Sequence, residues 1–401
     1  SPICVEMVGL PARGKTYTAR KLARYLSWLG YQARVFNVGN YRRERFGARV
    51  AHDFFDPTNP TGMNARKTAA LAALEDLKTW FTEGGQIGIY DATNSTKNRR
   101  KMVHDALRNA NVEVLFLETV CNDPNVIEAN IRESKLSNPD YIGMEPEQAV
   151  EDFRARIAHY EQAYEPLNDD SLSYIRVSDV SRRVELNRIS GFRMGRIVNF
   201  VMNLHITPRT IWLTRHGESL ANVAGTLGGD PDLSERGKRY AIALSEFVNL
   251  HSSEDHLSVW TSTLQRTIQT AKPLKRHCIE LRALDEIDAG ICDGLTYAEV
   301  AAQYPNEFAA RTTDKLRYRY PRGESYEDVI DRLDPLIIEL ERQKETVLVV
   351  AHQAVLRALY GYFAGRSRSE VPHIDMPLHT IIALTPKAYG CNERRFVLPP
   401  G

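Results

Sequence analysis

Short apolar runs alternate with longer amphipathic stretches along the first half of the chain. Four runs have the length and composition of buried strands: ICVEMV (3–8), ARVFNV (33–38), QIGIY (86–90) and VEVLFLE (112–118). The stretches between them repeat apolar positions at helical spacing, most clearly in 16–29, 64–81 and 147–164. This alternation predicts a mostly parallel sheet with helices on both faces.

A second alternation of the same kind begins after a break near residue 207. A long helix is expected over 188–204, and Pro208 disfavours helix in the residue before it. Beyond this point the strand-like runs are TIWLT (210–214), LSVWTS (257–262) and TVLVVA (346–351), and the helical patterns are 234–248, 326–342 and 354–363. We therefore predict an α/β protein of two α/β domains, residues 1–207 and 208–401.

Composition supports this division and narrows the function. A chain of 401 residues with 43% hydrophobic and 26% charged residues can bury two ordinary cores. The formal net charge is only +1, so anion binding must depend on local clusters of Arg and Lys. The five cysteines form no C-x-x-C pair, which argues against a disulfide framework or zinc site and fits a cytoplasmic protein. No apolar run approaches the ~20 residues of a membrane span.

The segment GLPARGKT (9–16) has every fixed position of the phosphate-binding pattern G-x-x-x-x-G-K-[ST]. A strand-like run precedes it and a helical pattern follows. The glycines let the loop curl so that backbone N–H groups face phosphates, Lys15 can reach the β- and γ-phosphates, and Thr16 can bind Mg²⁺. We interpret the segment as a nucleotide-binding loop; the alternative is a tight turn that binds no nucleotide.

An acidic residue and several basic clusters indicate which metal and which acceptor this first site could bind. Asp91 directly follows a strand-like run and could hold Mg²⁺ or accept a proton from an acceptor hydroxyl, although it could also be a turn residue. The clusters YRRER (41–45) and TKNRRK (96–101), with Arg66, fall in loops or at helix starts, where side chains converge on such a site. They favour an acceptor that already carries a phosphate; taken singly, each cluster could be a solvated surface.

A second set of residues, in the other half of the chain, could bind a phosphoryl group. Arg215 and His216 follow one strand-like run and His352 follows another, while Arg266 lies at a strand-to-helix turn. A neutral imidazole can attack phosphorus, arginine forks can stabilise the transition state, and a carboxylic acid such as Glu286 can protonate the leaving oxygen. A metal site is the weaker interpretation, because the two histidines lack an obvious third ligand.

Eight motifs, in this order, resemble one family along nearly the whole chain: MVGLPARGKTY, FNVGNYRRE, YDATNST, NIRESK, WLTRHGES, LDEIDAG, YRYPRGESYEDV and VLVVAHQAVLR. The chain resembles the bifunctional 6-phosphofructo-2-kinase/fructose-2,6-bisphosphatase family, and its second half resembles the histidine phosphatase, or phosphoglycerate mutase-like, superfamily. The resemblance implies transfer of the ATP γ-phosphoryl group to fructose 6-phosphate, and removal of that phosphate from fructose 2,6-bisphosphate through a phosphohistidine, which would control glycolysis and gluconeogenesis. It also implies Mg²⁺ as cofactor and a cytoplasmic homodimer that uses neither nucleic acid nor membrane.

The resemblance assigns residues of the first half to ATP, metal and acceptor. The nucleotide would be bound by Gly9, Leu10, Pro11, Ala12, Arg13, Gly14, Lys15, Thr16, Tyr17, Asn130 and Lys135. Thr16 and Asp91 would hold Mg²⁺, and Lys15, Asp91, Cys121 and Lys135 would be the catalytic residues. Fructose 6-phosphate would contact Arg42, Arg66, Thr93, Arg99, Lys135, Arg156 and Tyr160.

In the second half, the resemblance makes His216 the phosphoryl carrier and Glu286 the acid. Arg215, Arg266 and His352 would hold the reacting phosphate. The rest of the sugar bisphosphate would contact Asn222, Gly228, Tyr297, Arg311, Lys315, Tyr326, Gln353 and Arg357.

Three rival functions remain open at this point. One is a kinase–phosphatase for other phosphorylated substrates such as nucleic-acid ends, which would need a long basic groove with aromatic platforms. Another is a metabolite-sensing protein with one inactive half, against which the intact Lys15, His216 and His352 argue. In the third, the second half is a mutase or general phosphatase, which would use the same Arg, His and Glu.

Overall fold

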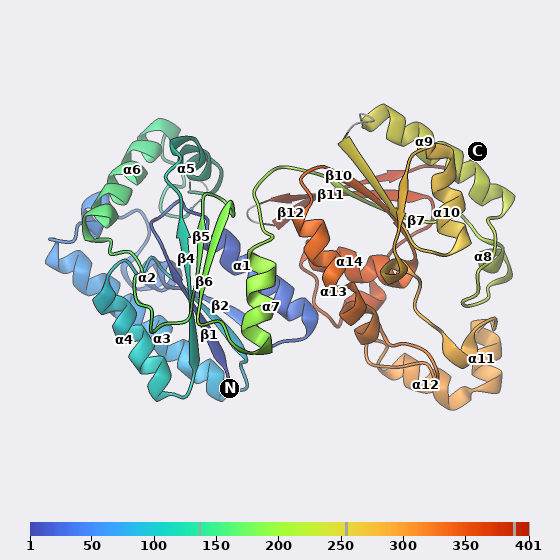
Figure 1. Ribbon diagram of the computed structural model, residues 1–401, viewed down its shortest axis with the longest axis horizontal. Helices are drawn as coiled ribbons and strands as arrows, with labels where there is room; N and C mark the ends of the chain where they lie inside the picture. The colour runs from blue at the N-terminus through green and yellow to red at the C-terminus, as the bar shows by residue number, and fades with distance from the viewer. Residues whose placement is uncertain (136–137, 253–255, 388–389, 401) are drawn as a thin grey trace. The chain divides into compact units, whose positions relative to one another are not determined.

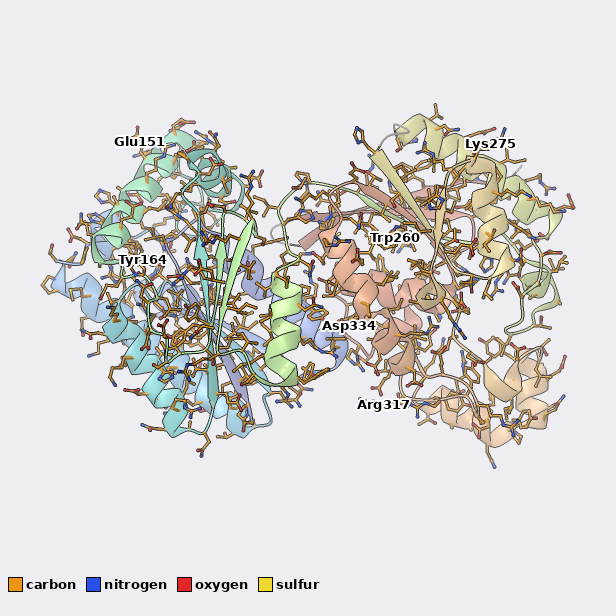
Figure 2. The ribbon with its side chains drawn as sticks, viewed as in Figure 1. Glu151, Tyr164, Trp260, Lys275, Arg317 and Asp334 are labelled. Carbon is orange, nitrogen blue, oxygen red and sulfur yellow. The ribbon has the colours of Figure 1, made fainter. Side chains whose placement is uncertain are left out.

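The computed structural model in Figure 1 describes residues 1–135, 138–252, 256–387 and 390–400. The chain divides into two compact units, Ser1–Ile206 and Thr207–Gly401. Each unit contains a mixed, mostly parallel sheet with helices packed on it, so the predicted fold class is confirmed. Figure 2 adds the side chains and labels Tyr164 in the first unit and Trp260 in the second.

In the first unit, the described residues form a six-stranded sheet in the order β2-β3-β1-β4-β5-β6. Its strands are β1 (Ile3–Val8), β2 (Ala33–Asn37), β3 (Ile87–Asp91), β4 (Glu113–Val120), β5 (Tyr174–Ser178) and β6 (Arg183–Asn187). All neighbours pair in parallel except β5 and β6, which form an antiparallel hairpin at the edge. Since β1 and β3 are parallel neighbours, the segments that follow them emerge at the same edge of the sheet.

The helical elements of this unit are α1 (Lys15–Leu29), α2 (Val38–Phe46), η1 (His52–Phe55), α3 (Pro60–Thr82), α4 (Lys97–Asn109), α5 (Pro124–Asn130), η2 (Ile131–Lys135), α6 (Pro146–Ala163) and α7 (Gly191–Val201). Helices α3 and α4 contribute apolar side chains to one core cluster on the sheet. On α1 and α7, the rings of Tyr25 and Phe200 stack with their centroids 4.3 Å apart. Two predicted helices have wrong bounds. Helix α3 starts earlier than residue 64, because Asn59 caps it ahead of Pro60, and α7 is shorter than 188–204 at both ends.

In the second unit, the described residues form a sheet in the order β12-β11-β7-β10-β8-β9. Its strands are β7 (Ile211–Arg215), β8 (Leu257–Thr261), β9 (Cys278–Glu280), β10 (Thr346–Ala351), β11 (Thr380–Lys387) and β12 (Gly390–Val397). Strands β7, β10, β8 and β9 run parallel, whereas β11 runs antiparallel to both β7 and β12. The parallel neighbours β7 and β10 end side by side, which brings Arg215 opposite Ala351.

The helical elements here are α8 (Leu220–Ala224), α9 (Glu235–His251), α10 (Gln265–Ala271), η4 (Lys272–Leu274), η5 (Arg282–Leu284), η6 (Gly290–Cys292), α11 (Tyr297–Gln303), α12 (Pro305–Thr313), α13 (Tyr326–Arg342), α14 (Gln353–Ala364) and η7 (Val371–His373). Side chains of α9 and α10 share a core cluster with β7, β8 and β10. A reciprocal cap between Ser325 and Asp328 fixes the start of α13. No helix in the described part of the chain is both long and apolar enough to cross a membrane.

Candidate active sites

The first site is built on the loop between β1 and α1. Gly9 has φ +148°, and a Cβ at this position would lie 2.7 Å from the carbonyl oxygen of Thr119 on β4. Gly14 has φ +82° and caps α1. Glycine suits both positions, because there is no room for a Cβ at residue 9 and both residues have a positive φ. Inside the loop, Lys15 Nζ donates to the carbonyl of Leu10 at 2.7 Å.

Asp91 meets the end of this loop. Thr16 Oγ1 donates to Asp91 Oδ2 at 2.9 Å, and Asn37 Nδ2 donates to the same oxygen at 2.9 Å. The carboxylate is almost fully buried. A hydroxyl and a carboxylate oxygen in contact are the hard oxygen ligands that Mg²⁺ prefers. Asn37 was missing from the sequence prediction, although its place at the end of a strand beside β3 could have indicated it.

A cleft of about 230 Å³ opens beside this pair. Its lining includes Lys15, Thr16, Asp91 and Lys135, together with the residues predicted to contact the acceptor: Arg42, Arg66, Thr93, Arg99, Arg156 and Tyr160. These side chains come from loops and helices that are far apart in the sequence. The structure therefore brings the predicted acceptor residues to one cavity, next to the phosphate-binding loop.

Asp140 holds three arginines at this cleft. Its Oδ2 lies 2.6 Å from Arg42 Nη2, 3.1 Å from Arg156 Nη1 and 3.5 Å from Arg43 Nη1. Burial alone would raise the pKa of Asp140, but Arg42 and Arg156 hold that pKa below its ordinary value. The carboxylate stays charged and fixes the arginines for an incoming anion. Sequence analysis missed this residue, although a pocket with so many cations needs a counter-charge.

The two lysines of the cleft, Lys15 and Lys135, have lowered pKa values. Burial, followed by the nearby charge of Lys135, lowers the pKa of Lys15 to about 7. Burial also lowers the pKa of Lys135 to about 8. A polyanion bound between them would restore both charges, because a neighbouring opposite charge favours the protonated amine.

Two other predicted residues support the loop from outside the cleft lining. Asn130 Nδ2 donates to the carbonyl of Ala12 at 3.0 Å. The carbonyl of Cys121 accepts from Arg13 Nε at 3.2 Å, and Arg13 also donates to the carbonyl of Pro11 at 2.8 Å. The contact that joins Cys121 to the nucleotide loop thus passes through its backbone, not its thiol.

The second site is built where β7 and β10 end. The His216 Nδ1 atom lies 2.6 Å from the carbonyl oxygen of Gly217, and only a protonated Nδ1 can make this hydrogen bond. Arg266 Nε donates to His216 Nε2 at 3.3 Å. The His352 ring lies 5.1 Å from that of His216, and its Nε2 is 2.8 Å from Ser262 Oγ. With the proton on Nδ1, Nε2 carries the lone pair that could attack phosphorus; here it accepts from Arg266, and this hydrogen bond must give way before an attack.

Burial keeps both histidines neutral. Burial, followed by the charge of Arg266, lowers the pKa of His216 to about 3. The same two causes hold the pKa of His352 well below its ordinary value. A neutral imidazole is the form that can attack phosphorus, and it persists here across the physiological pH range.

Glu286 and Arg215 complete the inner part of this site. Glu286 Oε1 accepts from the backbone N–H of Ile287 at 2.9 Å and of Ala354 at 3.2 Å, which places the carboxyl at the start of α14, beside His352. Arg215 Nη1 donates to the carbonyl of Met376 at 3.1 Å. Its Nε is buried and has no hydrogen-bond partner among the described residues, so it can serve an anion.

Further out, the predicted substrate residues make contacts in pairs. Arg311 Nη2 donates to Tyr297 Oη at 3.2 Å, and Arg357 Nη1 donates to Tyr326 Oη at 3.0 Å. Lys315 Nζ lies 5.9 Å from the centroid of the Tyr326 ring. Burial, with the charges of nearby arginines, lowers the pKa of Lys315 to about 8. These side chains form a second cationic group that suits another phosphate.

The remaining predicted residues have local structural roles. Asn222 Oδ1 accepts from the backbone and side chain of Ser219, in a reciprocal cap at the start of α8. Gly228 has φ +70°, which glycine adopts readily. Gln353 is the first residue of α14, directly after His352.

Comparison with known proteins bears on both halves. Residues 1–208 match the family described as 6-phosphofructo-2-kinase, and residues 211–398 match branch 1 of the histidine phosphatase superfamily. The chain is 51% identical to 6-phosphofructo-2-kinase/fructose-2,6-bisphosphatase 3 of Rattus norvegicus, over 99% of this chain and 72% of that protein. The chain belongs to this bifunctional family. The resemblance noted from the motifs is thereby confirmed.

One further relative and one solved structure are also similar to the chain. The 6-phosphofructo-2-kinase/fructose-2,6-bisphosphatase of Arabidopsis thaliana is 52% identical; the match covers 99% of this chain and 54% of the plant protein. A solved structure of the α-ribazole phosphatase from Shigella flexneri is 22% identical, with a TM-score of 0.44; the match covers 47% of this chain and 96% of that one.

Proposed function

We propose that this chain makes fructose 2,6-bisphosphate from ATP and fructose 6-phosphate in its first unit and hydrolyses it to fructose 6-phosphate and phosphate in its second. One observation carries the proposal. A phosphate-binding loop paired with Asp91 and a buried neutral His216 surrounded by arginines occur in one chain of this bifunctional family. The product of the first reaction is the substrate of the second.

In the first unit, the loop's backbone N–H groups and Lys15 would hold the ATP phosphates. Thr16 and Asp91 offer the ligands for Mg²⁺, which when bound neutralises charge on the phosphates. The arginines fixed by Asp140 would bind the phosphate that the sugar already carries. The sugar 2-hydroxyl would then attack the γ-phosphorus and lose its proton to Asp91, while the bond from that phosphorus to the β,γ-bridging oxygen breaks and ADP leaves. Lys135 would stabilise the transferred group.

In the second unit, His216 Nε2 would attack the 2-phosphate of fructose 2,6-bisphosphate. The bond from phosphorus to the sugar oxygen breaks as Glu286, in its acid form, protonates that oxygen. Arg215, Arg266 and His352 would stabilise the charge that spreads over the phosphoryl oxygens. Water then attacks the phosphohistidine and gives its proton to Glu286, which restores His216 and releases phosphate.

The second cationic group would hold the 6-phosphate of the same substrate. Contacts with Tyr297 and Tyr326 would orient Arg311, Lys315 and Arg357 before the substrate arrives. We further propose a cytoplasmic homodimer without nucleic-acid or membrane partners. The dimer and the absence of such partners rest on the family resemblance; the cysteine pattern, which has no C-x-x-C pair, supports only the compartment.

A single time course tests both reactions. The protein is mixed with fructose 6-phosphate and ATP labelled in its γ-phosphate, and label is followed in ATP, acid-labile sugar bisphosphate, protein phosphohistidine and free phosphate. Label should enter the sugar first, then His216, then phosphate. Label that stays in ATP would refute the kinase assignment. Hydrolysis of many other phosphate esters at similar rates would instead favour a general phosphatase.

A further inference from the structure

A third histidine of the second unit, His379, lies opposite the reactive one. Strand β11 pairs antiparallel with β7, with Ile381 opposite Thr214. Continuing this register by two residues places His379 across from His216. His379 is only 4% exposed, and its Nε2 accepts the backbone N–H of Glu218 at 3.0 Å. This partly buried hydrogen bond joins His379 to the loop that carries His216.

The loop is fixed by one partner for each successive backbone N–H group. The N–H of His216 donates to the carbonyl of Ala351 at 3.0 Å, and that of Gly217 to Thr270 Oγ1 at 2.9 Å. The N–H of Glu218 is served by His379. A lost partner leaves a buried donor unsatisfied and frees the loop to shift, which would move the His216 ring away from the phosphorus.

His379 itself is held in an unusual conformation. Its φ of +58° is uncommon for a residue with a side chain. Its ring packs 4.7 Å from that of Tyr240, whose hydroxyl is 2.6 Å from Thr214 Oγ1 on β7. Backbone strain of this kind persists where the surrounding structure enforces it, and it is concentrated at functional sites. In this backbone conformation the His379 ring contacts Tyr240 on one side and accepts from Glu218 on the other.

We infer that His379 is a positioning residue of the phosphatase reaction, whose Nε2 lone pair fixes the His216 loop in the geometry for attack on phosphorus. This inference rests on the proposed function. The lone pair requires that the ring carry its proton on Nδ1. The charged groups that face the ring are Arg236, Glu218 and Arg215; burial, followed by the charge of Arg236, lowers the pKa of His379 to about 4. The acceptor therefore persists at neutral pH.

The test uses two variants of the full chain. His379→Gln offers a carbonyl oxygen as an alternative acceptor, whereas His379→Phe keeps an aromatic ring on Tyr240 without any acceptor. We expect Phe to lower kcat for hydrolysis about tenfold, the effect of one unsatisfied buried donor on a reacting loop. KM should stay within about twofold, because His379 does not touch the substrate. Gln should recover most of the rate.

Rapid-quench experiments measure the rate of phosphohistidine formation, which a loss of packing alone would not change. The rate at which phosphohistidine forms on His216 should fall with kcat in the Phe variant and recover in the Gln variant. Kinase activity of the same molecules controls for protein concentration and for folding of the first unit, and thermal unfolding controls for the second.

Three outcomes would overturn the inference. If His379→Phe hydrolyses fructose 2,6-bisphosphate as fast as the wild type, this inference is wrong and the proposed function stands. Equal loss in both variants, together with a lower unfolding temperature and a raised KM, would make His379 a packing residue only. A wild-type protein that hydrolyses no fructose 2,6-bisphosphate would sink the proposed function, and this inference with it.

Discussion

The two sites use buried basic side chains in different protonation states. Burial lowers the pKa of Lys15 in the first unit and of His216 in the second. A lysine is useful to a kinase only when it carries its proton, because it binds phosphate through charge. A histidine nucleophile is useful only without a proton on the attacking nitrogen. Burial therefore makes the charge of Lys15 depend on a bound ligand, whereas it keeps His216 neutral and able to react.

The charges around Lys15 and His216 explain why burial has different consequences for the two residues. Lys15 and Lys135 are close to the carboxylate of Asp91, and a nucleotide would add further negative charge. His216 faces Arg266, whose charge opposes protonation. The kinase site is completed by its substrate, whereas the phosphatase site is preorganised before substrate arrives.

The largest effect should come from removing the nucleophile. His216→Ala should lower hydrolysis of fructose 2,6-bisphosphate by at least about a thousandfold, because the covalent route is lost. Kinase activity should be unchanged, since Lys15 and Asp91 lie in the other unit. Separate assays of bisphosphate formation and phosphate release measure both. Substantial remaining hydrolysis would show that another residue carries the phosphoryl group.

The reciprocal variant should give a smaller but still large effect. Lys15→Ala removes a charge aimed at the phosphates and should lower kinase turnover by at least about a hundredfold. Hydrolysis of added fructose 2,6-bisphosphate should stay at the wild-type rate. A parallel loss of both activities would contradict the independence of the two sites.

Proton uptake provides a direct test of the difference in protonation. At pH 8 Lys15, with its pKa of about 7, is mostly neutral in the free site, and a bound polyanion should raise that pKa. Binding a non-hydrolysable ATP analogue with Mg²⁺ should therefore take up about 0.9 of a proton at Lys15 and about half a proton at Lys135, whose pKa is about 8. Calorimetry in two buffers of different ionisation enthalpy measures this number. Lys15→Met should reduce the uptake; an unchanged value would place the titration elsewhere.

The smallest expected effect concerns the central strands beneath the sites. Glu6 on β1 is fully buried, and its carboxylate oxygens have no partner among the described residues. Burial raises the pKa of Glu6 well above its ordinary value. The folded state thus holds a proton that the unfolded chain releases above about pH 4.3, so wild-type stability falls as pH rises above that value. Glu6→Val should raise the free energy of unfolding by about 1 kcal/mol, and the gain should grow with pH.

Thermal unfolding at several pH values checks this prediction. A gain of 1 kcal/mol corresponds to about 2–4 °C in a unit of this size. Thr214 on β7 is the matched control, because it is also buried and polar in a central strand but its hydroxyl contacts Tyr240. Thr214→Val should therefore destabilise the protein. A loss of stability in Glu6→Val would mean that the carboxyl group of Glu6 has hydrogen-bond partners in the folded protein.

Sequence reasoning worked best where local patterns decide the outcome. The helical pattern over 326–342 predicts the bounds of α13, because its apolar positions repeat at helical spacing; in the structure a Ser325–Asp328 cap marks its start. It worked less well at α7, where a predicted helix from residue 188 begins at Gly191. The β5–β6 hairpin uses the chain up to Asn187, and that pairing leaves no periodic signal in a short strand.

The sites divide in the same way. Residues in motifs, such as Lys15 and His216, could be found from the sequence, and the structure places them at the sites. The residues that hold them could not: Asp140 and His379 act through contacts with segments distant in sequence, which only the fold brings together. A buried counter-charge or backbone acceptor has no spacing rule, so its position follows from packing.

The presence of both units in one polypeptide has a consequence for control. Every molecule synthesised adds one site for making the bisphosphate and one for destroying it. Their ratio is fixed at one to one, so changing the amount of protein alters how fast the metabolite responds but not the steady level it reaches. That set point can move only through the relative turnover rates of the two sites, and therefore through substrates, effectors or modifications that favour one unit over the other.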